Sequence, residues 1–164
     1  MYLQVKSWLI LLKNTKIKVL VEKLNSDKTL LGIEDDSRIT LINKIKEDIE
    51  GDILEHTVLA HCINCFGSRD IRVTQLKSEY GEWDMVVCKD DEMEVYRIVN
   101  SKEVVSDQYH SLIDDKMGKF GENLFRGNII RRVVLYNGLT MQVKVDECIV
   151  DYINIEEFLL SIKI

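Results

Sequence analysis

Proline is missing from the 164-residue chain. Turns must therefore be built from glycine, asparagine, aspartate and serine, and no proline-rich linker separates modules. Long apolar runs are missing too. The longest near the start, Trp8 to Leu12, is too short to span a bilayer or to form the core of a signal peptide. We therefore expect a cytoplasmic protein.

Cysteine is scarce, with four residues in the chain, and in the cytoplasm we expect reduced thiols. The stretch "HCINC" places His61 beside Cys62 and Cys65, but no second pair with zinc-site spacing follows, since Cys88 and Cys148 are single. A redox C-x-x-C would open a helix, whereas this pair lies near the end of a predicted one. We interpret these cysteines as small buried apolar residues and predict no metal.

Positive charge is in deficit, with a net charge of −6. Residues 1–33 hold six lysines and two acidic residues, so the remainder carries −10. An acidic body argues against nonspecific nucleic-acid binding, which needs a positive surface for phosphates. Arg126, Arg131 and Arg132 are a possible local contact for nucleic acid. A solvated strand edge is at least as good an interpretation of these arginines.

The length suits one ordinary domain with a real core. We predict a helix-and-strand appendage over residues 1–41 and an α/β domain over 42–164. Residues 2–12 favour a short helix. Residues 15–24 alternate as a strand does but also fit helical spacing, and we favour a strand that pairs with "KTLLGI".

From Ile42 to Phe66, apolar residues recur at three- and four-residue steps, which predicts a helix packed by one face. Gly67 follows as a C-terminal stop. Gly51 lies inside this helix, where glycine costs ~1 kcal/mol relative to alanine. A close approach to another backbone would explain it.

The remaining pattern predicts a mixed sheet sandwiched by helices. We expect strands at Ile71–Leu76, Glu82–Cys88, Glu94–Val99, Ile129–Tyr136, Met141–Val145 and Ile149–Ile153. A helix is expected over Asp107–Phe120, and Asn154 caps a final helix. Asn137-Gly138 predicts a two-residue hairpin between the fourth and fifth strands.

Residues 81–101, "GEWDMVVCKDDEMEVYRIVNS", raise the question of a nuclease site. Hydrolysis of a phosphodiester with Mg²⁺ needs carboxylates to hold the ion and a cation to stabilise developing charge. Asp84 qualifies as one ligand, and Glu55 on the predicted helix as another. Arg97 and Val99 stand where a further acid and a lysine would be needed. By these residues alone, the interpretation of Asp84 and Glu94 as ordinary polar positions of a hairpin is favoured.

Four segments together resemble a known family: "EGDILEHTVLA", residues 81–114 from "GEWD" to "SLID", "RRVVLYNG" and "DYINIEEFL". They are similar to the C-terminal domain of predicted bacterial and archaeal AAA+ ATPases, which has a restriction-endonuclease-like, PD-(D/E)XK core. The resemblance runs in order from about Glu50 to the end. It implies a mixed sheet flanked by helices.

The resemblance also assigns positions. The first acid of the family matches Asp84, the helix acid matches Glu55, and the glutamine of the following helix matches Gln108. The Glu-x-Lys pair falls on Arg97 and Val99, so both residues depart from the pattern. A guanidinium repels Mg²⁺, and valine supplies no cation. The family's phosphate-binding loop, G-x-x-x-x-G-K-[ST], is missing as well.

These departures lead us to expect a catalytically defective nuclease-like domain with a structural or interaction role and no cofactor. We expect Arg97 to pair with Asp84 or Glu55 instead of leaving room for a metal, and Glu94 to lie on the opposite face of the strand from Arg97. The partner would be a protein, either an ATPase half or a second copy. The alternatives are an active Mg²⁺-dependent nuclease with an unusual third ligand, and a nucleic-acid binder without catalysis.

Overall fold

The computed structural model describes residues 35–66 and 70–162, with side chains from residue 50 onward. The chain divides into two compact units, Met1–Thr57 and Val58–Ile164. The predictions for residues 2–12 and 15–24, for "KTLLGI" and for the stop at Gly67 lie outside the described residues. The proposed appendage over residues 1–41 stays a prediction, although α2 (Asp35–Phe66) continues through residue 42 without a break.

Helix α2 begins seven residues before the predicted Ile42, because apolar spacing marks where a helix packs and not where it starts. Within the second unit, Val58, Cys62 and Cys65 of this helix are buried, at the predicted steps of three and four. A Cβ on Gly51 would meet no described atom within 4 Å. The close backbone approach expected at Gly51 is therefore not found.

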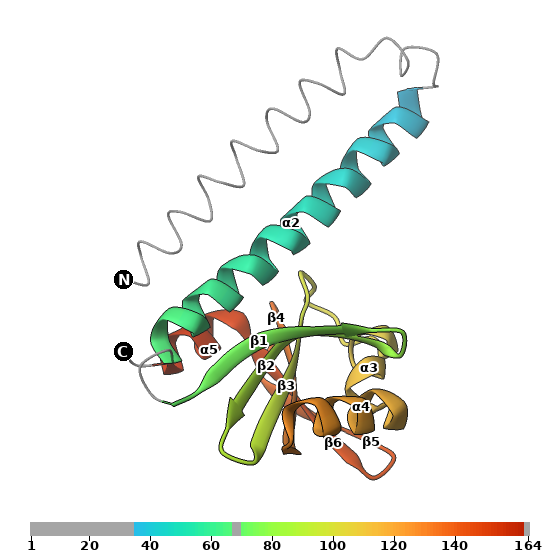
Figure 1. Ribbon diagram of the computed structural model, residues 1–164. Helices are drawn as coiled ribbons and strands as arrows, with labels where there is room; N and C mark the ends of the chain where they lie inside the picture. Colours follow the sequence, from blue (N-terminus) through green and yellow to red (C-terminus); the bar gives the residue numbers. More distant parts are fainter. Residues whose placement is uncertain (1–34, 67–69, 163–164) are drawn as a thin grey trace. The chain divides into compact units, whose positions relative to one another are not determined.

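The second unit is an α/β fold with a six-stranded mixed sheet, as predicted (Figure 1). Its strands are β1 (Arg72–Ser78), β2 (Gly81–Lys89), β3 (Glu92–Ile98), β4 (Asn128–Tyr136), β5 (Met141–Val145) and β6 (Cys148–Asn154). Their spatial order is β1-β2-β3-β4-β6-β5. The first three strands are antiparallel, β3, β4 and β6 run parallel, and β5 is antiparallel to β6.

The predicted hairpin between β4 and β5 is wrong, because β6 occupies the position beside β4 and β5 pairs only with β6 in the described sheet. The Asn137 N–H donates to Ser101 O at 2.7 Å, and its side chain donates to Asn100 Oδ1 at 2.9 Å. A Cβ on Gly138 would lie 2.3 Å from the Tyr136 ring. Asn137-Gly138 thus packs against the loop after β3 instead of reversing the chain.

The predicted helix Asp107–Phe120 is three shorter pieces: η2 (Ser106–Gln108), α3 (His110–Ile113) and α4 (Asp115–Phe125). Asp114 makes the break, since its backbone is extended and its side chain accepts the Met117 N–H at 2.8 Å. This is the geometry of a helix N-cap, so a new helix starts there. The final helix, α5 (Ile155–Ser161), has Asn154 as its N-cap, as predicted.

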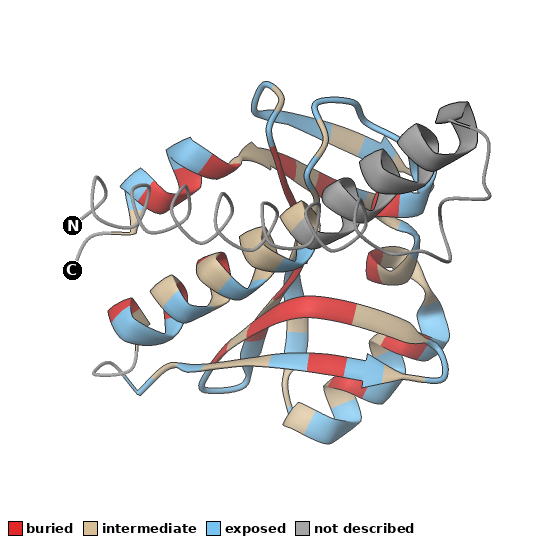
Figure 2. Cartoon of the chain, turned by 90° about the horizontal axis from the view of Figure 1, so that it is seen from above, coloured by how far each residue is buried: buried red, intermediate tan, exposed pale blue. Residues whose placement is uncertain are grey.

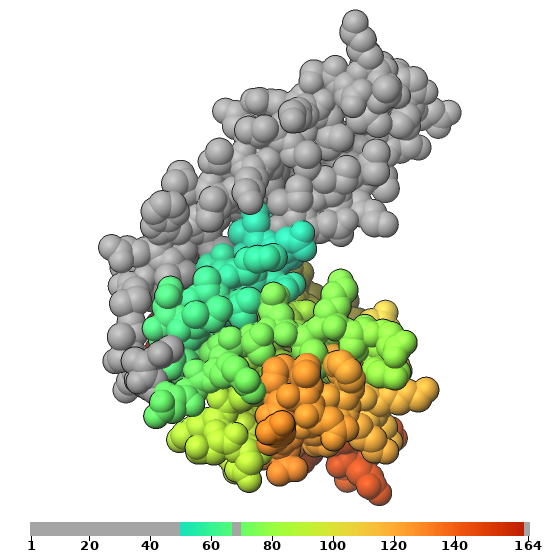
Figure 3. Space-filling model, in the orientation of Figure 1, coloured from blue at the N-terminus to red at the C-terminus, as the bar shows by residue number. Residues whose placement is uncertain are grey.

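Helices cover both faces of the sheet. Leu112 of α3 and Met117 of α4 join the core cluster that contains Val95 and Val134. The ring of Phe158 on α5 packs against Tyr96 on the other face, with centroids 5.7 Å apart. Figure 2 shows the buried residues concentrated in the strands and along one side of the helices. In the space-filling view, the orange surface of α4 lies directly against the green surface of β1 and β2 (Figure 3).

Two irregularities in the strand pairing change the direction of side chains, one between β1 and β2 and one between β3 and β4. Between the pairs Thr74–Val86 and Leu76–Trp83, β2 has two residues, Asp84 and Met85, where β1 has one. Between the pairs Met93–Ile129 and Glu94–Arg131, β4 has an extra residue, Ile130. Each is a β-bulge, a feature that bends a strand and alters the direction of the inserted side chain.

Candidate functional site

Asp84 lies in the bulge of β2 and is the one buried carboxylate of the described residues, with 4% of its surface exposed. Its Oδ2 accepts the Ile98 N–H of β3 at 2.6 Å. Its Oδ1 lies 3.3 Å from Arg97 Nη1. Burying a charge is costly unless it is paired and hydrogen-bonded, and both conditions are met here.

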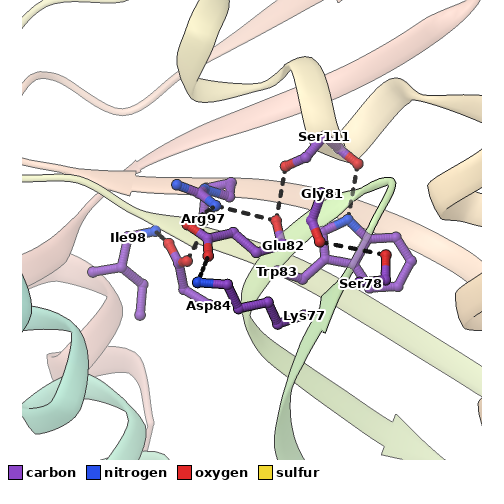
Figure 4. A network of polar contacts seen from close by, with 9 residues as sticks. All are labelled: Lys77, Ser78, Gly81, Glu82, Trp83, Asp84, Arg97, Ile98 and Ser111. Carbon is purple, nitrogen blue, oxygen red and sulfur yellow. Dashed lines mark hydrogen bonds and ion pairs between the residues drawn. The ribbon is translucent and has the colours of Figure 1, made fainter.

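Arg97 reaches from β3 to two carboxylates on β2 (Figure 4). Its Nη1 lies 3.3 Å from Asp84 Oδ1 and 3.0 Å from Glu82 Oε1, and it donates to the Glu82 carbonyl at 3.1 Å. Lys77 Nζ approaches the other oxygen of Glu82 at 3.3 Å. The expected pairing of Arg97 with Asp84 is confirmed, and Glu82 is a second partner.

Glu82 was missed in the sequence, although it precedes Asp84 by two residues on one strand and such residues share a face. The hydrogen bond from Arg97 holds the pKa of Glu82 below its usual value, partial burial opposes this effect, and the charges of Arg97 and Lys77 add to it. Glu82 is therefore a carboxylate at neutral pH, and two negative groups converge on one guanidinium.

This arrangement places the guanidinium of Arg97 beside two carboxylates that could otherwise bind a metal ion. Carboxylate oxygens are the ligands that Mg²⁺ prefers. Here they are engaged by Arg97 and by a backbone N–H. The described residues contain no cluster of three or more His, Cys, Asp or Glu side chains placed to hold a metal ion.

The ion pair is not fully satisfied. Within the described part of the chain, Arg97 Nε is buried without a hydrogen-bond acceptor. An imperfectly satisfied buried pair is weak evidence for stability, because desolvation offsets much of the attraction. The contacts of Asp84 with Arg97 and with the Ile98 N–H connect the bulge of β2 to β3.

The other residues that the resemblance assigns are Val99, Gln108 and Glu55, and they lie in different parts of the chain. Val99 packs against the core cluster, and its N–H donates to Leu135 O at 2.9 Å. Gln108 is buried, accepts the Val105 N–H at 3.2 Å and donates to Glu103 O at 2.9 Å, so it fixes the loop before α3. Glu55 lies on α2 within the first compact unit, and its position relative to Asp84 is not part of what the structure describes.

The three arginines considered for nucleic acid do not form one strip. Arg131 Nε pairs with Asp151 Oδ2 at 2.6 Å, whereas Arg132 Nε donates to Leu112 O of α3 at 2.9 Å. Successive residues of a strand point to opposite faces, and these contacts follow that rule. Arg126 is exposed and ends α4 with a left-handed backbone, φ 57°.

The cysteines are free thiols, and Cys62, Cys65 and Cys88 are buried as predicted, while Cys148 is half-buried. Burial, followed by the charge of Cys65, raises the pKa of Cys62 to about 12. Its thiolate is therefore scarce at neutral pH. Cys65 Sγ lies 3.5 Å from His61 Nε2, within the same helix.

The comparisons with known proteins are negative: no protein-family model and no curated protein matches the chain. Among the described residues, no helix has both the length and the apolar character needed to cross a membrane.

Proposed function

We propose that the chain carries a catalytically defective, restriction-endonuclease-like domain with a structural or interaction role. The observation that carries this proposal is the position of Arg97, whose Nη1 lies 3.3 Å from Asp84 Oδ1 and 3.0 Å from Glu82 Oε1. A guanidinium cannot ligate a metal, and its charge opposes the entry of one. The mixed sheet flanked by helices agrees with the layout that the resemblance implies.

The first test is calorimetric titration of the whole chain with Mg²⁺ and with Mn²⁺. We expect no binding isotherm, because the carboxylates of Asp84 and Glu82 already share the Arg97 cation. A clear isotherm that is lost in Asp84→Ala would overturn the proposal and favour the active nuclease with unusual ligands.

A cleavage assay on plasmid and on single-stranded DNA separates the same two functions. The wild-type chain should leave both substrates intact with either metal. The double variant Arg97→Glu, Val99→Lys restores the residue types that the resemblance leads us to expect, and it tests whether cleavage returns. Cleavage by the wild type that Asp84→Asn abolishes would contradict the proposal.

The interaction role is tested with the partner that the resemblance implies. A AAA+ ATPase encoded directly upstream of the chain should copurify with it at equal stoichiometry. Binding to DNA that weakens steeply with salt and disappears on charge reversal of Arg126 would instead favour the nucleic-acid binder.

A further inference from the structure

A hollow lies on the face of the sheet opposite Arg97, lined by residues of the β2–β3 hairpin, the end of α2 and the end of α5. Its volume of about 450 Å³ falls in the range of small-molecule sites. Apolar side chains form most of its wall: Phe66, Ile71, Val87, Met93, Ile130 and Phe158. The bulge in β4 supplies Ile130.

One carboxylate in this wall, that of Glu94, is held in place. The hydroxyl of Tyr96 donates a hydrogen bond to Glu94 Oε2, and both side chains line the hollow. Tyr96 is 4% exposed. Burial, followed by the charge of Glu94, raises the pKa of Tyr96, so its hydroxyl stays protonated and continues to donate. Glu94 is thus oriented by a neighbour that carries no charge.

Arg131 lies between two carboxylates and is closer to Asp151 than to Glu94. Arg131 Nε lies 2.6 Å from Asp151 Oδ2, while Arg131 Nη1 is 3.7 Å from Glu94 Oε2. Asp151 is therefore the main ion-pair partner of Arg131, and Asp151 does not line the hollow. Lys89 and Glu92 are directly opposite each other in the β2–β3 register, at the hairpin end. Glu94 thus has the Tyr96 hydroxyl and the longer Arg131 contact as its partners, and neither is a cation bound closely to it.

We propose that this hollow binds a small organic ammonium compound with an apolar or aromatic body. The ammonium group donates to Glu94, and the body fills the space between Phe158, Ile130 and Ile71. Carboxylates form charge-assisted hydrogen bonds with ammonium donors, and aromatic rings attract cations. The site is independent of the proposed function, because Glu94 and Arg97 lie on opposite faces of β3 and share no partner among the contacts described above.

The test uses three ligands of one shape and different charge: benzylamine, benzyl alcohol and benzoate. Each is titrated into the isotopically labelled whole chain and followed by two-dimensional amide NMR. We expect benzylamine to bind about tenfold more tightly than benzyl alcohol, the size of one charge-assisted hydrogen bond, with shifts in the β2–β3 hairpin and α5. Benzoate should bind most weakly.

Two variants locate the contact. Glu94→Gln should reduce the affinity for benzylamine about tenfold and leave that for benzyl alcohol unchanged. Glu147→Gln, an exposed acid outside this hollow, should bind benzylamine as the wild type does. The proposal is overturned if benzoate binds as tightly as benzylamine, if benzylamine does not bind, or if its shifts map elsewhere. These three outcomes are read on the wild-type chain and do not depend on the folding of any variant.

Discussion

Arg97 and Asp84 form an ion pair across β2 and β3, with Arg97 Nη1 3.3 Å from Asp84 Oδ1 and the carboxylate 4% exposed. The same carboxylate accepts the Ile98 N–H at 2.6 Å. Asp84 therefore has a structural role in this chain. The pair also joins the bulge of β2 to the end of β3, where an extra residue would otherwise loosen the ladder.

Asp84→Ala should lower the free energy of unfolding by about 2–4 kcal/mol, because it leaves the Ile98 N–H and part of the Arg97 charge without a partner. Asp84→Asn, which keeps an acceptor for Ile98, should cost about half as much. Urea denaturation measures both. Asp91→Ala, at an exposed turn position, should stay within about 0.5 kcal/mol of the wild type. Equal stabilities for all three variants would contradict the role given to Asp84.

Arg97→Glu should create a weak metal site, because it adds a third carboxylate beside Asp84 and Glu82. Without metal, the variant should unfold at a lower temperature than the wild type, owing to repulsion among the acids. Mn²⁺ at a tenfold excess over its Kd should then raise the midpoint by about 3–6 °C. Arg97→Gln is the matched control and should show no such rise. A rise of the same size in the control would exclude metal binding at these carboxylates.

The contact between α4 and β2 gives a packing prediction. A Cβ on Gly121 would lie 2.3 Å from Trp83 Cζ3, and Trp83 is 1% exposed, so its ring has no free space to move into. Gly121→Ala should therefore destabilise the protein by about 1–3 kcal/mol through overpacking. Gly118→Ala in the same helix is the control, since its nearest neighbour, Ile129 Cδ1, is at 3.7 Å.

For Gly118→Ala we expect stabilisation by about 0.5–1 kcal/mol, the gain from a better helix former. Thermal and urea unfolding of the two variants give the comparison. If Gly121→Ala is as stable as Gly118→Ala, the close packing of α4 on Trp83 is not as described.

The lowered pKa of Glu82 predicts part of the acid sensitivity of the fold. A carboxyl group whose pKa is lower in the folded state contributes stability that is complete above its unfolded pKa of about 4.3 and is lost as the pH falls through the lower folded value. The free energy of unfolding should therefore decrease from pH ~5 downward. Arg97→Gln removes the main cause of the shift and should give a shallower decrease over the same interval. Parallel pH profiles for the two proteins would show that Glu82 does not contribute.

Much of the sheet could be predicted from the sequence, because alternation and apolar runs mark strands wherever one or both faces are buried. All six strands of the second unit lie within a few residues of their predicted positions. Each of the two errors, at Asp114 and at Asn137-Gly138, has a specific cause. In the sequence, Asp114 resembles an ordinary helical position. In the structure, its side chain accepts the Met117 N–H and caps the start of α4. Asn137-Gly138 has the composition of a hairpin turn, but its hydrogen bonds go to Asn100 and Ser101, far away in the sequence.

The candidate site was predictable in part. Asp84, Arg97 and Val99 were singled out in the sequence, and we expected Arg97 to pair with Asp84 or Glu55. Glu82 and the Tyr96–Glu94 pair were not. The sequence places these residues on strands, but which of them meet depends on two bulges and on which helix covers which face.

The sequence by itself determined the strands and the final helix with its Asn154 cap. These features depend on residue type and local spacing, which the chain carries directly. Only the tertiary structure decided that β6 and not β5 lies beside β4, that Arg131 and Arg132 face opposite sides, and that two carboxylates share Arg97. Strand order and side-chain pairing join residues far apart in sequence, and packing selects among pairings that local patterns leave equal.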